Sequence, residues 1–125
     1  MILGLGLDIQ EIARVEKALA RGGAAFLKKT FTPAEVRYCR RALKRAERFA
    51  ARFCAKEAFL KALGTGWARG IAWTEVEVGH RAGGAHWLKL SGRALSHARR
   101  AGEKTLWLTL THSSGYAAAT VILEG

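Results

Sequence analysis

The chain has 125 residues, a length that predicts one folded domain spanning residues 1–125. Half of the residues are hydrophobic, a quarter are charged and proline occurs once, a composition that excludes a disordered protein. No apolar run approaches the roughly 20 residues that cross a bilayer, and the first residues lack the basic start and long apolar stretch of a signal peptide. We therefore expect a cytoplasmic protein with no membrane partner.

The charge of the chain indicates an anionic partner. There are 21 Lys and Arg against 10 Asp and Glu, a formal net charge of +11 at pH 7 with histidine neutral. Such a surplus suits a nucleic acid, a phosphorylated small molecule or an acidic protein, and composition does not choose among them. Cys39 and Cys54 are too few for a disulfide framework and lack the spacing of a structural zinc site.

Residues 2–8 alternate in the pattern of a β-strand. The two faces of this strand hold three leucines and a set of small residues that ends in a carboxylate, namely Leu3, Leu5 and Leu7 against Gly4, Gly6 and Asp8. Asp8 could open the following helix as the first residue of a capping box with Glu11. The glycines also clear space beside Asp8, and Mg²⁺ is usually held by one or two carboxylates together with phosphates and water. A cap and a metal ligand therefore stay open as roles for Asp8.

The segment after this strand predicts a helix that Gly22 and Gly23 end, since its apolar residues recur at helical spacing. Arg14, Lys17 and Arg21 fall on a different, exposed face of that helix. This basic face is a candidate surface for an acidic partner.

Two further helices are predicted before residue 65. Residues 32–35, Thr-Pro-Ala-Glu, form the capping box of a helix that should reach about Leu43. Residues 45–63 are dense in Ala, Leu, Lys and Glu and end at Gly64, so they predict the longest helix of the chain.

Glu57 is the unusual residue of that long helix. A helical wheel places it in the middle of an apolar stripe formed by Ala46, Phe49, Ala50, Phe53 and Leu60. A carboxylate on a buried face needs a cation, a metal or strong donors, or else it takes up a proton. Lys61, one turn on, could supply an ordinary ion pair. The helix alone therefore leaves a structural and a functional role for Glu57 open.

The second half of the chain changes to strand periodicity. Four strands are predicted at 74–78, 86–90, 105–112 and 116–123, with one helix at 91–102. We expect an α+β fold, a single domain in which the long central helix packs on a mainly antiparallel sheet. His112 falls at a strand end before a turn, whereas His80, His86 and His97 have no partner pattern and are expected to face solvent.

Phosphate-loop motifs are missing from the sequence. There is no GxxxxGK[ST], and Gly4-x-Gly6 lacks the third glycine of GxGxxG because residue 9 is Ile. The glycine-rich loop at 64–70 offers flexible backbone N–H groups and suits phosphate, although with low specificity.

Three segments together resemble one family. GLGLDIQEIARVE at 4–16, RFCAKEAFLKALGTG at 52–66 and LTHSSGYAAATVIL at 110–123 look like the signatures of the holo-acyl-carrier-protein synthases, the small bacterial 4′-phosphopantetheinyl transferases. Their order and spacing match over nearly the whole chain. The resemblance implies a homotrimer that transfers 4′-phosphopantetheine from coenzyme A to a serine of apo acyl carrier protein, with Mg²⁺, and releases adenosine 3′,5′-bisphosphate.

The resemblance also implies roles for single residues. Asp8 and Glu57 match the Mg²⁺ ligands, and Lys61 matches a lysine near the pyrophosphate. Arg14, on the basic face with Lys17 and Arg21, matches a contact to the carrier protein. The positions that match coenzyme contacts are Arg52, Gly64, Thr65, Gly66 and His112.

The sequence departs from the family pattern at three places. Ala51 stands where a glycine is usual, the turn at 113–115 lacks the usual charged residues, and the hairpin near 79–86 lacks the usual Gly-Lys-Pro.

The implied chemistry suits these residue types. Attack on the β-phosphorus of a pyrophosphate builds charge that Mg²⁺ and Lys61 can stabilise where water is excluded. The attacking serine must lose a proton, which Glu57 could accept directly or through a metal-bound water.

A basic nucleic-acid-binding module is the rival interpretation. The basic stretch has no helix-turn-helix, RNP or zinc-finger signature, and a carboxylate on an apolar helix face has no role in binding phosphodiesters. A purely structural interaction protein would leave Asp8 and Glu57 unexplained. We therefore expect no nucleic-acid partner.

Overall fold

The structure, a computed structural model, describes residues 1–125 apart from the side chain of residue 68. The helices and strands are, in chain order, β1 (Ile2–Glu11), α1 (Ile12–Thr30), α2 (Pro33–Arg40), α3 (Arg45–Leu63), β2 (Val76–His80), β3 (His86–Leu90), α4 (Gly92–Arg100), β4 (Thr105–Ser113) and β5 (Tyr116–Glu124). Two short 3-10 turns, η1 (Gly66–Arg69) and η2 (Trp73–Glu75), follow α3.

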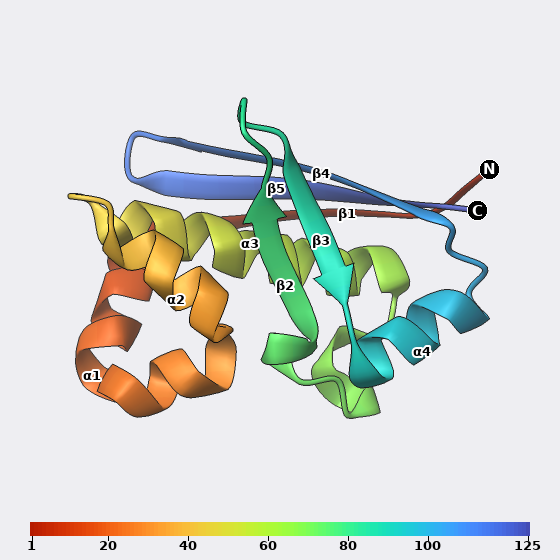
Figure 1. Ribbon diagram of the computed structural model, residues 1–125, viewed down its shortest axis with the longest axis horizontal. Helices are drawn as coiled ribbons and strands as arrows, with labels where there is room; N and C mark the ends of the chain where they lie inside the picture. Colours follow the sequence, from red (N-terminus) through yellow and green to blue (C-terminus); the bar gives the residue numbers. More distant parts are fainter.

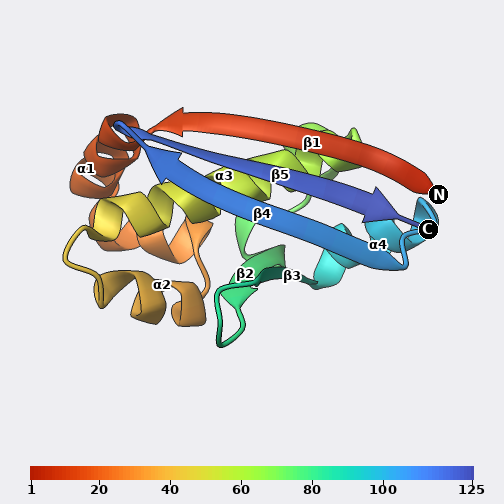
Figure 2. The same ribbon diagram turned by 90° about the horizontal axis from the view of Figure 1, so that it is seen from above.

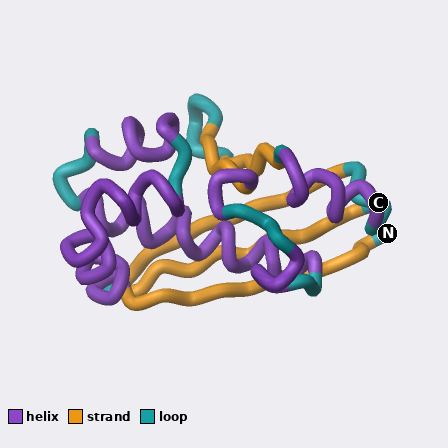
Figure 3. Tube along the Cα trace, turned by 90° about the horizontal axis from the view of Figure 1, so that it is seen from below, coloured by secondary structure: helices purple, strands orange, loops and turns teal.

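The strands form two antiparallel sheets. β5 lies between β1 and β4 in a three-stranded sheet, and β2 pairs with β3 in a separate hairpin. The long helix α3 runs along one face of the larger sheet, with α1 and α2 at one end of the molecule and α4 near the other (Figures 1 and 2). All helices therefore lie on the same side of β1, β5 and β4, as Figure 3 shows. The predicted α+β class, with a long helix on an antiparallel sheet, is confirmed.

The predicted helix boundaries hold where a local cap defines them. The capping box of Thr32 and Glu35 is present at the start of α2, and Gly64 ends α3 in the left-handed region with φ of 79°. The helix α2 stops at Arg40, short of the predicted Leu43. As predicted, the first helical segment ends at Gly23, whose φ of 53° is not helical, and a second helical segment follows directly, so that α1 is kinked there and reaches Thr30.

One predicted strand is shifted along the chain. Residues 73–75 form the turn η2 rather than the start of β2. The Glu75 carboxylate accepts hydrogen bonds from the backbone N–H of Ala72 at 2.9 Å and of Arg93 at 3.0 Å, so it stabilises this turn and the start of α4. A side chain that satisfies two backbone donors stabilises the turn over an extended strand.

The glycines of β1 allow this strand to lie directly against α3. A Cβ atom added to Gly4 would collide with the carbonyl oxygen of Ala62, and one added to Gly6 would collide with that of Ala58. Small residues on both elements thus bring the backbones together. The close approach places the end of β1, and hence Asp8, beside the C-terminal half of α3.

The helix α3 is buried on more sides than its apolar stripe predicts. Lys56 is fully buried, and its ammonium donates to Glu35 Oε1 at 2.9 Å and to the carbonyl oxygens of Trp73 at 3.0 Å and Val76 at 2.6 Å. Burial lowers the pKa of Lys56, and the Glu35 carboxylate opposes that change. This network ties α2, α3 and the start of β2 to one another.

The outer face of the three-stranded sheet is apolar and uncovered in a single chain. Leu5 and Leu7 are each 63% exposed, and Ile9 is 62% exposed. Trp107 on β4 and Tyr116 on β5 are also exposed. The predicted alternation along β1 is therefore present, with the glycine face packed inward and the leucine face bare. No helix among the described residues is long and apolar enough to cross a membrane.

Candidate active site

Asp8 lies near the end of β1 and is buried. Lys61 Nζ from α3 lies 3.1 Å from Asp8 Oδ1 and also donates to the carbonyl oxygen of Leu7 at 3.0 Å. Gln10 Nε2 donates to Asp8 Oδ2 at 3.0 Å. The capping role considered for Asp8 is wrong, because α1 begins after Glu11 and has no side-chain cap.

Glu57 lies beside this pair at the edge of the buried face of α3, not at its centre as the helical wheel predicts. Its carboxylate accepts a hydrogen bond from Trp67 Nε1 at 3.3 Å. Burial raises the pKa of Glu57, the Trp67 hydrogen bond lowers it, Asp8 raises it and Lys61 lowers it, with a net increase. Among the described residues no cation lies within ion-pair distance of Glu57, so the ordinary pair with Lys61 is not formed.

Trp67 is a functional candidate that the sequence reasoning missed. Its ring lies 3.7 Å from that of Trp73, which stacks on Phe53 at 4.8 Å. This aromatic cluster carries the indole N–H to Glu57 and covers one side of the carboxylate. The one available signal was a tryptophan in a glycine-rich loop after α3, where an exposed aromatic residue needs a reason.

The pair of carboxylates could hold a hard divalent cation. The negative charges of Asp8 and Glu57 repel each other. Lys61 pairs with Asp8, so the charge of Glu57 is left without an ion-pair partner among the described residues. No group of three or more metal-ligating side chains occurs among the described residues. Two protein carboxylates leave the other positions to phosphates and water, which is the way Mg²⁺ is commonly bound.

The glycine-rich loop lies at the same end of α3. Gly64 and Gly66 adopt positive φ values of 79° and 58°, and Thr65 Oγ1 donates to the carbonyl oxygen of Gly66 at 3.0 Å. A Cβ atom at either glycine would meet no neighbour, so the glycines serve backbone conformation and not close packing. The loop leads directly into Trp67.

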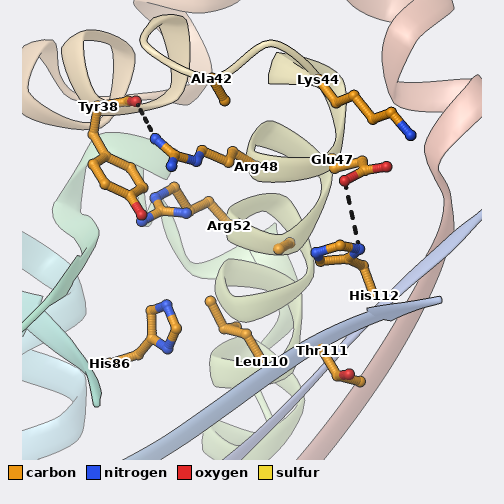
Figure 4. Close-up of a pocket in the computed structure, with 11 residues that line it drawn as sticks. Tyr38, Ala42, Lys44, Glu47, Arg48, Arg52, His86, Leu110, Thr111 and His112 are labelled. Atoms are coloured by element: carbon orange, nitrogen blue, oxygen red, sulfur yellow. Dashed lines mark hydrogen bonds and ion pairs between the residues drawn. The ribbon is translucent and has the colours of Figure 1, made fainter. Parts of the chain in front are cut away.

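A second group of predicted residues lines a pocket of about 540 Å³ on the other side of α3. Arg48 and Arg52 extend from α3 toward Tyr38, and His112 on β4 faces Glu47 with a separation of 3.5 Å (Figure 4). The guanidinium carbons lie 4.1 Å and 4.3 Å from the centre of the Tyr38 ring. Cations above an aromatic face are attracted by its quadrupole, so Tyr38 helps to hold two like charges close together.

Arg52 is only 3% exposed, and its Nε is a buried nitrogen without a hydrogen-bond partner among the described residues. No carboxylate of the described residues lies within ion-pair distance of it. A buried cation without a counter-ion attracts an anion. Arg52 is therefore a candidate anion-binding residue of this pocket.

His86 also lines this pocket and, like His97, is half-buried, so the expected full exposure to solvent is found only for His80. His80 is exposed as predicted and packs on Tyr38 with ring centres 4.3 Å apart, while His97 is half-buried on α4. The hairpin β2–β3 carries His86 to α3, a contact that periodicity along one strand does not reveal.

The predicted partner-binding residues lie near the carboxylate group. Arg14, Lys17 and Arg21 are exposed on α1, which begins where β1 ends. Arg14 lines a cavity of about 190 Å³ together with Gln10, whose amide contacts Asp8. Arg14, at the start of the basic face of α1, therefore lies near the candidate metal site.

The predicted site residues thus form two groups within one chain. Asp8, Glu57, Lys61 and the loop 64–66 lie on the β1 side, whereas Arg52 and His112 lie on the β4 side. Because β1 and β4 are opposite edges of the sheet, one chain does not bring the two groups together.

Comparison with known proteins identifies the family. A family model described as 4′-phosphopantetheinyl transferase superfamily matches residues 4–121. The chain belongs to this superfamily. The prediction of a phosphopantetheinyl transferase from the three motifs is thereby confirmed.

Relatives of the superfamily match over their full length. The chain is 50% identical over 124 residues to a holo-[acyl-carrier-protein] synthase of Trichlorobacter lovleyi, with 99% of this chain and 98% of the relative covered. It is 52% identical over 128 residues to one of Anaeromyxobacter dehalogenans strain 2CP-1, with 100% and 98% covered.

Solved structures of the superfamily share the fold. The synthase of Neisseria meningitidis has a TM-score of 0.89 and 32% identity, with 100% of each chain covered. That of Helicobacter pylori in complex with coenzyme A has a TM-score of 0.84 and 27% identity, with 96% of this chain and 99% of that chain covered.

Proposed function

We propose that this chain transfers the 4′-phosphopantetheine group of coenzyme A to a serine of apo acyl carrier protein, with Mg²⁺, and releases adenosine 3′,5′-bisphosphate. The observation that carries the proposal is the cluster in which Lys61 lies against Asp8 beside the half-buried Glu57. A relative that shares this fold was solved with coenzyme A, which supports the choice of donor.

Asp8 and Glu57 would hold the metal ion. When bound, Mg²⁺ would act as a Lewis acid toward the pyrophosphate oxygens of coenzyme A. Asp8 and Glu57 suit Mg²⁺ because both are oxygen ligands, lie close enough to affect each other's charge, and have between them one ion-paired cation, Lys61 beside Asp8.

Lys61 and Glu57 would assist the transfer of the phosphoryl group from coenzyme A to the serine. The serine oxygen forms a bond to the β-phosphorus, and the bond from that phosphorus to the bridging oxygen breaks, so that the α-phosphate leaves as the 5′-phosphate of adenosine 3′,5′-bisphosphate. Lys61 stabilises negative charge that develops on these oxygens. Glu57 would accept the serine proton, either directly or through a water molecule bound to the metal.

The other predicted residues would bind the two substrates. The loop 64–66, Arg52 and His112 would contact coenzyme A, whose phosphates suit an unpaired buried arginine. The basic face of α1, formed by Arg14, Lys17 and Arg21, would dock an acidic surface of the carrier protein next to Asp8.

We further propose a homotrimer. The bare apolar face of the sheet is unfavourable in water, and burial of such a face is the usual reason for association. A ring of copies would also place the β1 edge of one subunit near the β4 edge of the next, and so unite the two groups of site residues. In a closed ring every subunit makes the same two contacts and no edge is left without a neighbour, so cyclic symmetry is favoured.

The experiment is to incubate the protein with coenzyme A, Mg²⁺ and an apo carrier protein, and to weigh the carrier by mass spectrometry. We expect a carrier heavier by one phosphopantetheine group, with adenosine 3′,5′-bisphosphate formed in equal amount. A carrier protein of unchanged mass, after incubation with the folded protein and Mg²⁺, would contradict the proposal.

A further inference from the structure

The pocket on the β4 side contains one more group that can carry positive charge. His86 reaches it from the start of β3, across the pocket from His112 on β4 (Figure 4). Its ring is half-buried, and the ring of His80 lies 6.3 Å away on the paired strand.

The surroundings of His86 favour its neutral form while the pocket holds only protein. Burial lowers the pKa of His86, and the positive charge of Arg52 and the neighbouring His80 lower it further. A neutral imidazole avoids a third adjacent charge in a pocket where Arg48 and Arg52 already flank Tyr38.

A bound phosphate would reverse this preference. Arg52 is buried and its Nε has no hydrogen-bond partner among the described residues, so the pocket already holds one cation without a counter-ion. An anion placed between Arg52 and His86 would stabilise the imidazolium and add a second charge-assisted hydrogen bond. The pocket would then gain one proton for each anion bound.

We propose that His86 contacts a phosphate group of coenzyme A and takes up a proton when it does so, so that acid strengthens coenzyme binding by this chain. The inference rests on the proposed function, which supplies the phosphate-bearing ligand. His86 is thus a specificity-determining residue of the coenzyme site that the resemblance to the family does not include.

Other charged groups in contact with the pocket and hairpin set the background for this titration. They come from α2, the segment before α3, α3, β2 and β4, and are Tyr38, Lys44, Glu47, Arg48, Arg52, His80 and His112. Glu47 is the one acid among the described residues that line the pocket, and it lies 3.5 Å from His112, so it serves that histidine and not His86. The ligand itself also titrates, because a phosphate monoester loses its second proton near pH 6.

Calorimetry of coenzyme A binding tests the proposal. Titrations at pH 6.5 in buffers with different ionisation enthalpies measure the number of protons taken up, for the wild type, His86→Gln and His97→Gln. His97 lies on α4, which contributes no residue to the pocket among those described, so His97→Gln is the matched control. The titration of the free ligand is common to all three proteins, so a difference in proton uptake between them arises in the bound complex.

We expect proton uptake by the wild type and by His97→Gln that is lost in His86→Gln. The ratio of Kd at pH 8 to Kd at pH 5.5 should be about tenfold greater for the wild type than for His86→Gln, as one charge-assisted hydrogen bond predicts. His86→Lys should bind tightly at both pH values, because its charge does not depend on pH in this range.

The source of the phosphate is identified with dephospho-coenzyme A, which lacks the 3′-phosphate. Loss of the His86-dependent uptake with this ligand would assign the contact to the phosphate monoester, and its persistence would assign it to the pyrophosphate. Either result supports the proposal.

Equal proton uptake and equal pH dependence in the wild type and His86→Gln would overturn it. If His86→Gln fails to fold, an NMR titration of the histidine Cε1–H signals of the wild type decides the matter, since the His86 signal must titrate at higher pH with adenosine 3′,5′-bisphosphate than without it. A carrier protein that is modified normally while His86 shows no change would reject this inference alone, whereas an unmodified carrier would reject the proposed function.

Discussion

Asp8 and Glu57 are two carboxylates beside one cation, Lys61, which is ion-paired with Asp8 and not with Glu57. If both hold Mg²⁺, each is required for the reaction and neither is required for the fold. We predict that Asp8→Ala and Glu57→Ala each lower kcat/KM for transfer by at least about a hundredfold, as expected for lost charge stabilisation at a reacting centre. The measurement is the rate of carrier modification, with circular dichroism as the check of folding.

The control for this prediction is Glu103→Ala, a carboxylate between α4 and β4 that belongs to neither group of site residues. It should leave the rate unchanged. Full activity in Glu57→Gln, or no effect of chelating Mg²⁺, would show that the metal assignment is wrong.

The raised pKa of Glu57 also predicts a pH-dependent effect on stability. The folded protein holds the proton of this carboxyl more tightly than the unfolded chain, so the ionised form destabilises the fold. The unfavourable term is absent below the ordinary glutamate pKa of about 4.3 and develops as the pH rises through the higher folded pKa. Without Mg²⁺, Glu57→Gln should therefore raise the Tm at pH 7.5 and have a smaller effect at pH 4.

Thermal unfolding followed at both pH values measures this effect. Addition of Mg²⁺ at pH 7.5 should raise the Tm of the wild type more than that of Glu57→Gln. The cation binds the ionised Glu57 carboxylate, which the variant does not have. The same change in Tm at pH 4 and pH 7.5 would argue against an ionised, destabilising Glu57.

At the scale of elements, the contact of β1 with α3 positions the carboxylate site. A methyl group at residue 6 would collide with the backbone of α3, which cannot move aside as a side chain can. Overpacking of this kind costs about 1–3 kcal/mol, and we expect Gly6→Ala to reach at least the upper end of that range. Separation of β1 from α3 should also move Asp8 away from Lys61, so the KM for coenzyme A should rise and kcat should fall.

Chemical denaturation of Gly6→Ala measures the free energy of unfolding. Lys89→Ala is the control, since Lys89 is exposed on β3 and lies outside the three-stranded sheet. A Gly6→Ala protein as stable as the wild type would mean that β1 and α3 can separate without loss.

The helix α1 presents the basic face that we assign to the carrier protein. Charge reversal in Arg14→Glu should raise the KM for apo carrier protein with little change in the KM for coenzyme A, because electrostatic attraction acts on the acidic partner. The rate at low carrier concentration should fall as salt rises. Arg99→Glu on α4 is the control, an exposed arginine distant in sequence from the site.

Nucleic acid would show a similar dependence on salt, so a competition experiment separates the two partners. Duplex or single-stranded nucleic acid is added at equal charge concentration. Tight binding of nucleic acid at physiological salt, with no affinity for the apo carrier, would assign the basic face of α1 to that partner.

At the scale of the whole molecule, the bare sheet face predicts association. Leu7→Asp places a charge on this face, where a neighbouring subunit would bury it without a partner, and should convert the trimer into monomers. Activity should fall with the trimer, because the two groups of site residues lie at opposite edges of one sheet. Sedimentation equilibrium at micromolar concentrations measures the mass of the wild type and of Leu7→Asp.

Leu43→Asp is the control for this variant, because Leu43 is fully exposed in the segment before α3 and lies outside the sheet. It should remain a trimer. A wild-type mass equal to that of one chain across the same concentrations would refute the homotrimer.

Local signals were sufficient for much of the architecture. The alternation of β1, the capping box of Thr32 and Glu35 and the left-handed Gly64 each depend on neighbours within a few residues, so they could be recognised in the sequence. The three motifs likewise identified the family without a structure, since they preserve residue types in a fixed order.

Only the tertiary structure decided which residues meet. The sequence could not show that the glycine face of β1 packs inward and the leucine face stays bare, because both faces fit a strand. It suggested Glu57 as the partner of Lys61, yet the approach of β1 supplies Asp8 instead. The indole of Trp67 and the burial of Arg52 depend in the same way on elements distant in the sequence. Periodicity reports what one segment prefers, whereas a site depends on contacts between segments that only the packed chain brings together.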